Sequence, residues 1–220
     1  MSTYITLAPD NFEASIDEAA KLISAGGVGV IAAEHGYMYV ANAFDHEAVR
    51  NIHILRGDPA YTASQVIVGS ADVLSGIATD FDADFRSLAD AFWPGLLSIQ
   101  VAANASLNWD LGDGGTLAEF AVRVPTQNFL RTLASKTGPL AVGSAAIVGS
   151  GPSHEIQFVP AHESAIAIYV DEGPLVPGPA STLVRRQVLG KPGGLIAARV
   201  GAISLAQLQA ILPTLGPSAT

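Results

Sequence analysis

Apolar side chains recur at helical spacing in several parts of the chain, and these segments predict its helices. In the segment 10–26, Ile16, Ala19 and Ile23 fall on one face, and Gly26-Gly27 ends the run. Ser204 and Gln207 form a capping box before a last apolar face. By the same reasoning, helices are expected at residues 45–55, 70–77, from 84 to the stop at Pro94, around 129–133, and from 204 to 212.

Short apolar runs bounded by turn residues predict the strands. Residues 28–32 are apolar throughout, which predicts a strand buried on both faces. The Gly-rich segment 104–116 predicts a flexible loop. Because strands and helices alternate without a strict βαβ rhythm, we expect an α/β fold of the α+β type, a twisted mixed sheet with flanking helices. The other predicted strands are 37–41, 65–68, 96–102, 120–124, 140–143, 165–170, 182–188 and 195–199.

Composition favours one domain over residues 1–220. The 220 residues are 49% hydrophobic, and no low-complexity tract or Pro/Ser/Gly-rich linker divides them. No apolar run reaches the ~20 residues of a membrane span, and the N-terminus lacks an export signal, so no membrane partner is expected. The absence of cysteine excludes disulfides and thiolate chemistry. A cytoplasmic location is the expectation, and nothing in the sequence indicates an oligomeric state.

Charge is distributed unevenly along the chain. Residues 1–113 hold 15 acids and 4 bases, and residues 114–220 hold 5 acids and 7 bases, which gives −11 and +2 and the net charge of −9. A chain this acidic is poorly suited to the phosphate contacts of nucleic-acid binding. A nucleic-acid partner is therefore not expected. A local anion site would form if the fold brought together six bases of the second part: Arg123, Arg131, Lys136, Arg185, Arg186 and Arg199.

No residue pattern predicts a metal site. Asp80, Asp82 and Asp84 alternate like the first ligands of a calcium loop, but the glycine and terminal glutamate of such a loop fall on Phe85 and Ala91. These acids are therefore expected at a solvated helix start. The histidines lack the spacing of zinc ligands.

Short motifs occur in a fixed order along the chain, and together they resemble the YrdC family. The turn 32–39 overlays the family's Pro-Thr-Asp-Thr-x-Tyr-Gly-Leu, and Arg56–Pro59 overlays its Lys-x-Arg-Pro. Each match is weak alone, but their common order over about residues 12–212 is specific. Five further matches follow in sequence: Phe92–Gly95 (Phe-Trp-Pro-Gly), Arg123–Pro125 (Arg-x-Pro), Ser144–Gly149 (Ser-Ala-Asn-x-Ser-Gly), Ser181-Thr182 (Ser-Thr) and Arg199–Ile203 (Arg-x-Gly-Ala-Ile).

This resemblance implies a fold and an activity. The fold would be the YrdC/RibB-like sheet around a concave cavity. The activity would be that of a threonylcarbamoyl-AMP synthase, a nucleotidyltransferase that uses ATP, threonine and bicarbonate for a tRNA modification, with ATP and Mg²⁺ as the implied cofactors. The resemblance assigns no catalytic residue. It places nucleotide contacts on five side chains: Arg56, Arg123, Ser144, Ser181 and Arg199.

Several positions depart from the family pattern. Asp58 stands where the second basic residue of Lys-x-Arg is expected, and Thr62 replaces the basic residue that follows it. Ala32-Ala33, Ala146 and Val148 replace groups that form hydrogen bonds. An acid two residues from Arg56 would neutralise that arginine and repel phosphate. These losses predict impaired or altered activity.

Each of these residues also has a purely structural interpretation. An interaction with the dipole at the end of its helix would explain Arg56, and a structural ion pair would explain Arg123. Ser144 and Ser181 are hydroxyls of the kind found at turns and strand ends.

Three functional hypotheses follow. The first is an active threonylcarbamoyl-AMP synthase, and the second is a non-catalytic paralogue that binds a nucleotide, a small anion or a protein partner. The third is a double-stranded RNA-binding module, against which the charge of −9 argues. The sequence leaves open whether the chain is an enzyme. Ancestry is what the sequence supports best, so the function is named after the first hypothesis.

Overall fold

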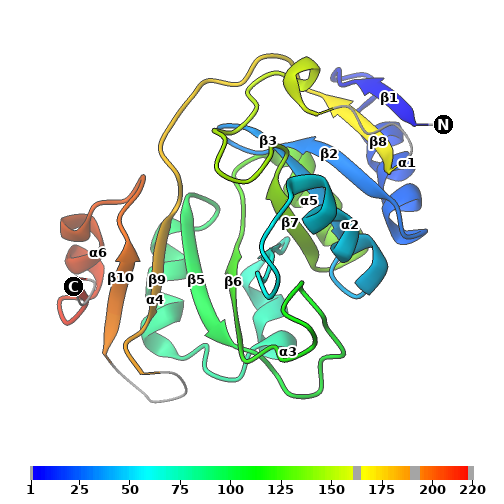
Figure 1. The fold of residues 1–220 in the computed structure, drawn as a ribbon. Helices are drawn as coiled ribbons and strands as arrows, with labels where there is room; N and C mark the ends of the chain where they lie inside the picture. Colours follow the sequence, from blue (N-terminus) through cyan, green and yellow to red (C-terminus); the bar gives the residue numbers. More distant parts are fainter. Residues whose placement is uncertain (1, 161–164, 189–193, 218–220) are drawn as a thin grey trace.

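The computed structural model describes residues 2–160, 165–188 and 194–217 (Figure 1). Within these ranges the α-helices are α1 (Phe12–Ser24), α2 (His46–Arg56), α3 (Leu74–Ile77), α4 (Ala83–Phe92), α5 (Asn128–Thr137) and α6 (Leu205–Ile211). The strands are β1 (Thr3–Thr6), β2 (Val28–Ala32), β3 (Tyr37–Asn42), β4 (Gln65–Ile67), β5 (Leu97–Ala102), β6 (Glu119–Arg123), β7 (Leu140–Ser144), β8 (Ile166–Asp171), β9 (Thr182–Arg186), β10 (Leu195–Arg199) and β11 (Gly216–Pro217).

All of these strands join one mixed sheet in the order β1-β8-β2-β3-β7-β4-β6-β5-β9-β10-β11. The β2–β3 pair is an antiparallel hairpin in which Ala32 pairs with Tyr37, whereas β8 runs parallel to both β1 and β2. We call β1, β8, β2, β3 and β7 the β2 part of the sheet, and β6, β5, β9, β10 and β11 the β5 part. The short strand β4 joins them, antiparallel to β7 and parallel to β6.

Helices cover both faces of the β2 part, which explains the continuous apolar sequence of β2. Val30 packs into the core on the side of α2, while Ile31 packs into a second core with α1 and α5. Every residue of β2 is buried, because successive side chains point to opposite faces and each face meets a helix. The prediction of a strand buried on both sides is confirmed.

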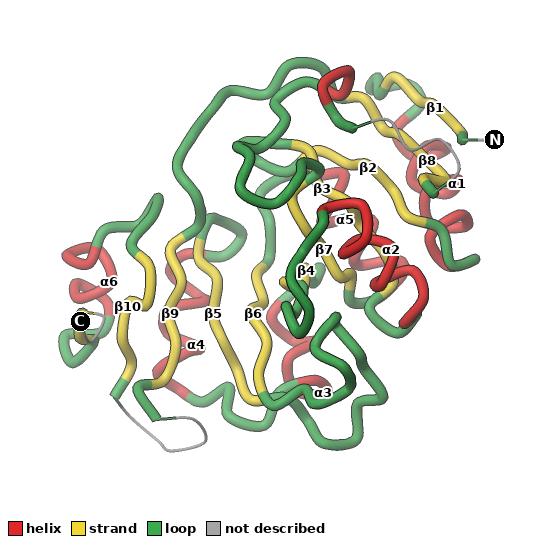
Figure 2. Tube along the Cα trace, viewed as in Figure 1, coloured by secondary structure: helices red, strands yellow, loops and turns green. Residues whose placement is uncertain are grey.

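The β5 part is backed by α4 and α6 and turned relative to the β2 part, so the sheet as a whole is strongly twisted (Figure 1). A long loop, residues 172–181, leaves the end of β8 and crosses to β9 in the other part (Figure 2). We call this loop the strap. It is tied to the β2–β3 hairpin by the Tyr37 hydroxyl, which accepts the N–H of Glu172 at 3.0 Å and donates to the carbonyl of Gly173 at 2.9 Å. Burial raises the pKa of Tyr37, so this hydroxyl keeps its proton.

The sequence predicted most elements correctly, with differences at the edges of the sheet. The mixed α/β fold is confirmed, but β1 and β11, the outermost strands, were not predicted. Strand β9 ends at Arg186, two residues earlier than expected. The segment 104–116 is irregular, as predicted, yet the side chains of Trp109 and Leu111 are buried in the core. None of the described helices combines the length and the hydropathy that a membrane span requires.

The acids at the start of α4 are not merely solvated, and this corrects the sequence prediction. Asp80 and Asp82 hold the guanidinium of Arg186, whose side chain is 3% exposed, through contacts of 3.1 and 2.6 Å. The same guanidinium lies 4.8 Å above the ring of Phe85. Arg186 therefore joins β9 to α4 as an ion-pair partner and does not belong to an anion site.

We expect Arg186→Ala to destabilise the protein strongly. Removing one partner of a buried ion pair costs about 3–5 kcal/mol, because the other charge stays buried without compensation. Arg185→Ala is the matched control, since Arg185 is the neighbouring residue on the less buried face of β9, and a loss below about 1 kcal/mol is expected there. Urea denaturation of both variants measures the difference, and equal losses would contradict the role of Arg186.

Candidate functional site

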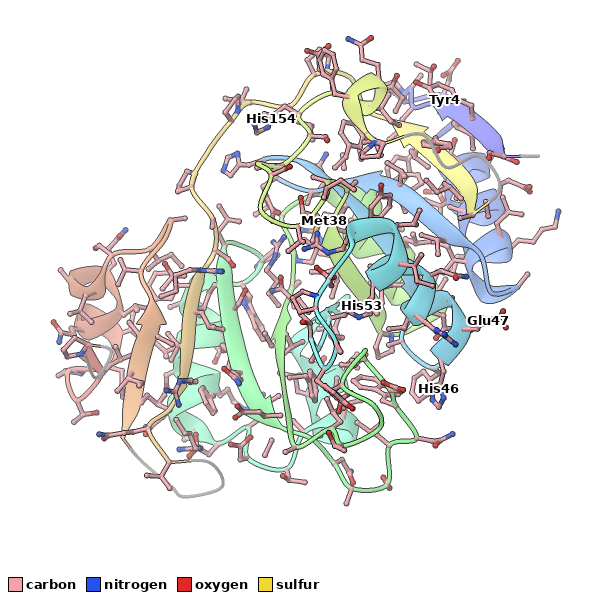
Figure 3. All side chains as sticks on the ribbon, in the orientation of Figure 1. Tyr4, Met38, His46, Glu47, His53 and His154 are labelled. Atoms are coloured by element: carbon pink, nitrogen blue, oxygen red, sulfur yellow. The ribbon has the colours of Figure 1, made fainter. Side chains whose placement is uncertain are left out.

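A cavity of about 520 Å³ lies between the two parts of the sheet. Its volume is in the range of small-molecule sites. Its walls come from the β2–β3 turn, the end of α2, the ends of β7 and β10, and the strap. Met38 and His53 lie on its lining, in the space between the two parts (Figure 3). All five residues assigned by resemblance line this one cavity: Arg56, Arg123, Ser144, Ser181 and Arg199.

Arg56 is the last residue of α2 and is paired with Asp58, as the sequence predicted. Gly57 ends the helix in the left-handed conformation, with φ of 66°, and this turns the chain so that Asp58 faces back toward the helix. Arg56 Nε donates to Asp58 Oδ2 at 2.8 Å, and Nη1 donates to the carbonyl of Ser144 at 2.5 Å. Asp58 is 4% exposed, so the pair is largely removed from water.

His53 is a member of this wall that the sequence analysis missed. Its Nδ1 lies 2.9 Å from Asp58 Oδ2, and its Nε2 lies 2.8 Å from the carbonyl of Leu111 and 3.0 Å from Ser64 Oγ. The contacts run from the Ser64 hydroxyl through the His53 imidazole to the Asp58 carboxylate, as they do in a hydrolytic triad. The Asp58 carboxylate and the Leu111 carbonyl both only accept, and a neutral imidazole donates from one nitrogen alone, so a neutral His53 donates to one of these two oxygens. The cluster forms a hydrogen-bonded wall of the cavity.

Arg123, at the end of β6, is paired with Glu34 of the β2–β3 turn. Arg123 Nη1 lies 2.6 Å from Glu34 Oε1, and Thr126 donates to the same oxygen from its backbone N–H at 2.9 Å and from its hydroxyl at 3.2 Å. Burial alone would raise the pKa of Glu34, but the guanidinium charge and these hydrogen bonds outweigh burial and lower the pKa below its ordinary value. The structural ion-pair interpretation of Arg123 is thus confirmed alongside its place on the cavity wall.

Arg199, at the end of β10, faces no carboxylate within ion-pairing distance among the described residues. Its guanidinium contacts the carbonyl of Ser181 at 2.9 and 3.1 Å and Ser181 Oγ at 3.1 Å. Ser181 Oγ in turn lies 2.8 Å from Ser98 Oγ, which accepts from the side chain of Gln65 at 2.6 Å. Arg199 is therefore the arginine of the cavity whose charge is not balanced by an internal acid.

Two polar atoms on residues that line the cavity have no hydrogen-bond partner within the part of the chain that the structure describes. They are Ser144 Oγ and the second carboxylate oxygen of Glu34, both buried. Buried polar groups are normally satisfied, and unpaired ones concentrate at functional sites.

The six bases of the second part of the chain do not form one anion site. Arg123 and Arg199 line the cavity, but Arg186 is held by Asp80 and Asp82, and Lys136 pairs with Asp17. The described residues contain no cluster of three or more side chains suited to a metal ion.

Solved structures with this architecture identify the fold. The chain superposes on a variant of Sua5 from Pyrococcus abyssi with a TM-score of 0.87 at 24% identity, over 99% of this chain and 62% of that one. A second Sua5 structure from P. abyssi, a complex with L-threonine, matches with a TM-score of 0.85. YciO from E. coli matches with a TM-score of 0.78 at 19% identity, over 94% of this chain and all of that one. These likenesses define a Sua5/YciO-like fold.

The sequence comparison then gives the family. Residues 21–196 match the Sua5/YciO/YrdC family model, described as telomere recombination, and the chain belongs to this family. It is 33% identical over 184 residues to a protein of Mycobacterium tuberculosis that is provisionally named threonylcarbamoyl-AMP synthase, with 83% of each chain covered. It is 29% identical over 183 residues to the threonylcarbamoyl-AMP synthase of P. abyssi, and there it spans 53% of the longer relative. The resemblance to the YrdC family is confirmed.

We expect Glu34→Gln to destabilise the protein near neutral pH, because Arg123 would then be buried beside an uncharged partner. The folded-state pKa of Glu34 lies below its ordinary value of 4.5. The ionised Glu34 carboxylate therefore contributes its full stabilisation above the ordinary pKa of 4.5. This stabilisation is lost as the pH falls through the lower pKa of the folded state. Thermal melts should show a constant gap between wild type and variant from about pH 7 to 5 and a narrowing gap below about pH 4.5.

The control for this prediction is Glu47→Gln, which removes the same charge from an exposed position on α2. A gap for Glu34→Gln that does not narrow in acid would show that the lost stability is steric and not electrostatic.

Proposed function

We propose that the cavity binds ATP and that the chain forms a carbamoyl-adenylate of the threonylcarbamoyl-AMP type, slowly when the amine is threonine. One observation carries this proposal: the five residues that the family overlay assigns to the nucleotide line a single cavity in a chain that belongs to the family. The relatives named as threonylcarbamoyl-AMP synthases support the reaction class.

The reaction requires positioning and cationic stabilisation. A carbamate oxygen attacks the α-phosphorus of ATP, the bond between the α-phosphorus and the bridging oxygen breaks, and pyrophosphate leaves with the bond electrons. Arg199 is suited to the phosphates, because its planar guanidinium is not paired with any acid in ranges 2–160, 165–188 and 194–217. Ser144 Oγ, which is unpartnered, and Ser181 Oγ add hydroxyl groups on the same lining.

Mg²⁺ would come with the nucleotide and not from a preformed protein site. Glu34 and Asp58 are the acids on the cavity lining, and each is already held by an arginine. Mg²⁺ commonly binds through substrate phosphates and retained waters, with one or two protein carboxylates at most. The fit of this cavity to Mg²⁺ therefore depends on the phosphates of ATP.

A second candidate is a nucleotide- or anion-binding protein without catalysis. The pairing of Arg56 with Asp58 and of Arg123 with Glu34 favours it, because two of the three arginines that line the cavity are neutralised before any ligand arrives. Binding without turnover would select this candidate. The dispersal of the remaining bases gives no support to the RNA-binding hypothesis.

We predict that the wild-type protein binds an ATP analogue with a methylene group between the α- and β-phosphates, measured by isothermal titration calorimetry with Mg²⁺. Arg199→Ala should weaken binding at least tenfold, because a hydrogen bond to a charged group contributes about 1.5–3 kcal/mol. Arg185→Ala, outside the cavity lining, should leave the affinity unchanged. No measurable binding by the wild-type protein would refute the proposed function.

We also predict slow turnover with threonine. The rate should be lower than that of a relative with the complete motif by a factor on the order of 10²–10³, because one cationic contact to the developing charge is lost at Asp58. Pyrophosphate release with ATP, threonine and bicarbonate measures it. Asp58→Arg alone should restore little. The combination of Asp58→Arg, Thr62→Lys, Ala33→Thr and Ala146→Asn should restore release that depends on both threonine and bicarbonate. Rapid threonine turnover by the wild-type protein would contradict the prediction.

A further inference from the structure

His53 lies in the cavity wall with an accepting oxygen opposite each of its ring nitrogens. Nδ1 is 2.9 Å from Asp58 Oδ2, and Nε2 is 2.8 Å from the carbonyl of Leu111. The side chain of His53 is 14% exposed, so water has little access to either nitrogen. The resemblance to the family assigns no role to this histidine, and the five nucleotide contacts do not include it.

A neutral imidazole cannot donate to both oxygens, because only one of its nitrogens carries a proton. If Nε2 carries it, the lone pair of Nδ1 faces the negative charge of Asp58. If Nδ1 carries it, the Ser64 hydroxyl at 3.0 Å can donate to Nε2, but the lone pair of Nε2 still faces the carbonyl of Leu111. An imidazolium donates to both oxygens at once. The geometry around His53 therefore favours its charged form.

The charge of His53 decides the net charge of this wall. Asp58 Oδ2, the atom that faces His53, also accepts from Arg56 Nε at 2.8 Å. With a neutral His53, the charges of Arg56 and Asp58 cancel, whereas an imidazolium makes two cations against one anion. Arg56 is 18% exposed, and no described residue accepts from its Nη2. This nitrogen is therefore left for an anionic ligand.

We propose that His53 is a positioning residue for the phosphates of the nucleotide: as an imidazolium it shares Asp58 with Arg56, and Asp58 then no longer cancels the charge of the guanidinium. His53 acts through Asp58 and Arg56 and is not a catalytic residue. This inference rests on the proposed function, in which Arg56 contacts the nucleotide, and it specifies the protonation state of the wall that binds the nucleotide.

Nucleotide affinity should in consequence depend on pH. The charge of an imidazole ordinarily changes between about pH 5 and 8. As the pH rises through this range, the wall loses its net positive charge and its attraction for phosphate decreases. The coupling is reciprocal, so a bound nucleotide should hold the proton on His53 more tightly by the same factor.

Other titratable or charged side chains surround His53 and contribute to any pH dependence. Besides Arg56 and Asp58, those on the lining of the same cavity are Glu34, His35, Arg123 and Arg199. A second cavity, of about 610 Å³, shares His53 and Asp58 with the first, and its other such residues are His46, Glu47, Arg50, Tyr61 and Asp110. The loop that contacts His53 through Leu111 also carries Asp113. All of these groups remain when His53 alone is replaced, so a comparison with such a variant isolates its contribution.

His53→Asn tests the inference, because an asparagine amide can donate to Asp58 but carries no charge. Titration calorimetry with Mg²⁺ and the methylene analogue of ATP gives the Kd of each protein at pH 6 and at pH 8. The ratio of the variant Kd to the wild-type Kd should be larger at pH 6 by a factor of about 3–10, the size of one screened charge interaction across about 10 Å. The titration of the ligand phosphates cancels in this ratio.

His46→Asn is the matched control. It removes an exposed histidine of the same helix region that lies outside the lining of the first cavity. The ratio of its Kd to the wild-type Kd should be equal at pH 6 and pH 8. A thermal melt of each variant establishes that it is folded.

The wild-type protein gives a second measurement, which decides the question if His53→Asn does not fold. Nitrogen-15 NMR of the His53 ring, recorded over a pH series, shows where the ring loses its second proton. This pH should rise by about 0.5–1 when the methylene analogue is bound, which corresponds to the same factor of about 3–10 in affinity.

The outcomes separate this inference from the function on which it rests. A ratio that rises in acid for His53→Asn but not for His46→Asn, or a ring that keeps its second proton to higher pH in the complex, supports the inference. If the analogue binds but the ratio for His53→Asn does not change, if His46→Asn shows the same rise, or if the ring titrates identically with and without the analogue, the inference is wrong and nucleotide binding is retained. If the analogue does not bind the wild-type protein at either pH, the proposed function fails, and the inference fails with it.

Discussion

The ion pair between Arg123 and Glu34 is the interaction on which the cavity depends. It joins the end of β6, in the β5 part of the sheet, to the β2–β3 turn of the β2 part. Both side chains are nearly buried, with 5% and 9% exposure, and water therefore screens their attraction weakly. Either charge alone would be buried without a partner. The ion pair, together with the Thr126 hydrogen bonds to the same carboxylate, therefore fixes the β2–β3 turn against the end of β6. The strap is tied to the same hairpin through Tyr37.

The opposed charges in the cavity give it stability and limit its chemistry at the same time. A buried arginine needs an acceptor, and in this chain acids supply it for Arg56 and Arg123. The charges of Arg56 and Arg123 are therefore compensated before any ligand binds, whereas Arg199 has no acidic partner among the described residues. If these arginines had no acidic partners, the site would bind phosphate or carboxylate more strongly. The positive charges of the arginines would, however, repel one another when no ligand was bound. The pairing with Asp58 thus neutralises the charge that Arg56 would otherwise bring to the cavity.

Much of the fold could be predicted from periodicity, because long amphipathic helices and wholly apolar strands have strong local signals. Strands β1 and β11 could not, since a four-residue strand with alternating exposure and a two-residue strand ending in Pro217 have almost no pattern of their own and depend on pairing with β8 and β10. The motif order located all five cavity residues. It located Asp58 as the partner of Arg56 but missed two other members of the walls. Glu34 lies 89 residues from Arg123, and His53 reaches Asp58 only because the helix ends between them.

The left-handed Gly57 after α2 has a consequence for how this family can change over time. It fixes the backbone so that position 58 faces Arg56 and His53 regardless of the side chain placed there. Since the turn itself is specified by the glycine, a single codon at position 58 can exchange an acid for a base or a neutral group without a new loop. The shape of this turn and the charge on the cavity wall are in this way specified by neighbouring but different residues, so the charge can change while the turn stays the same.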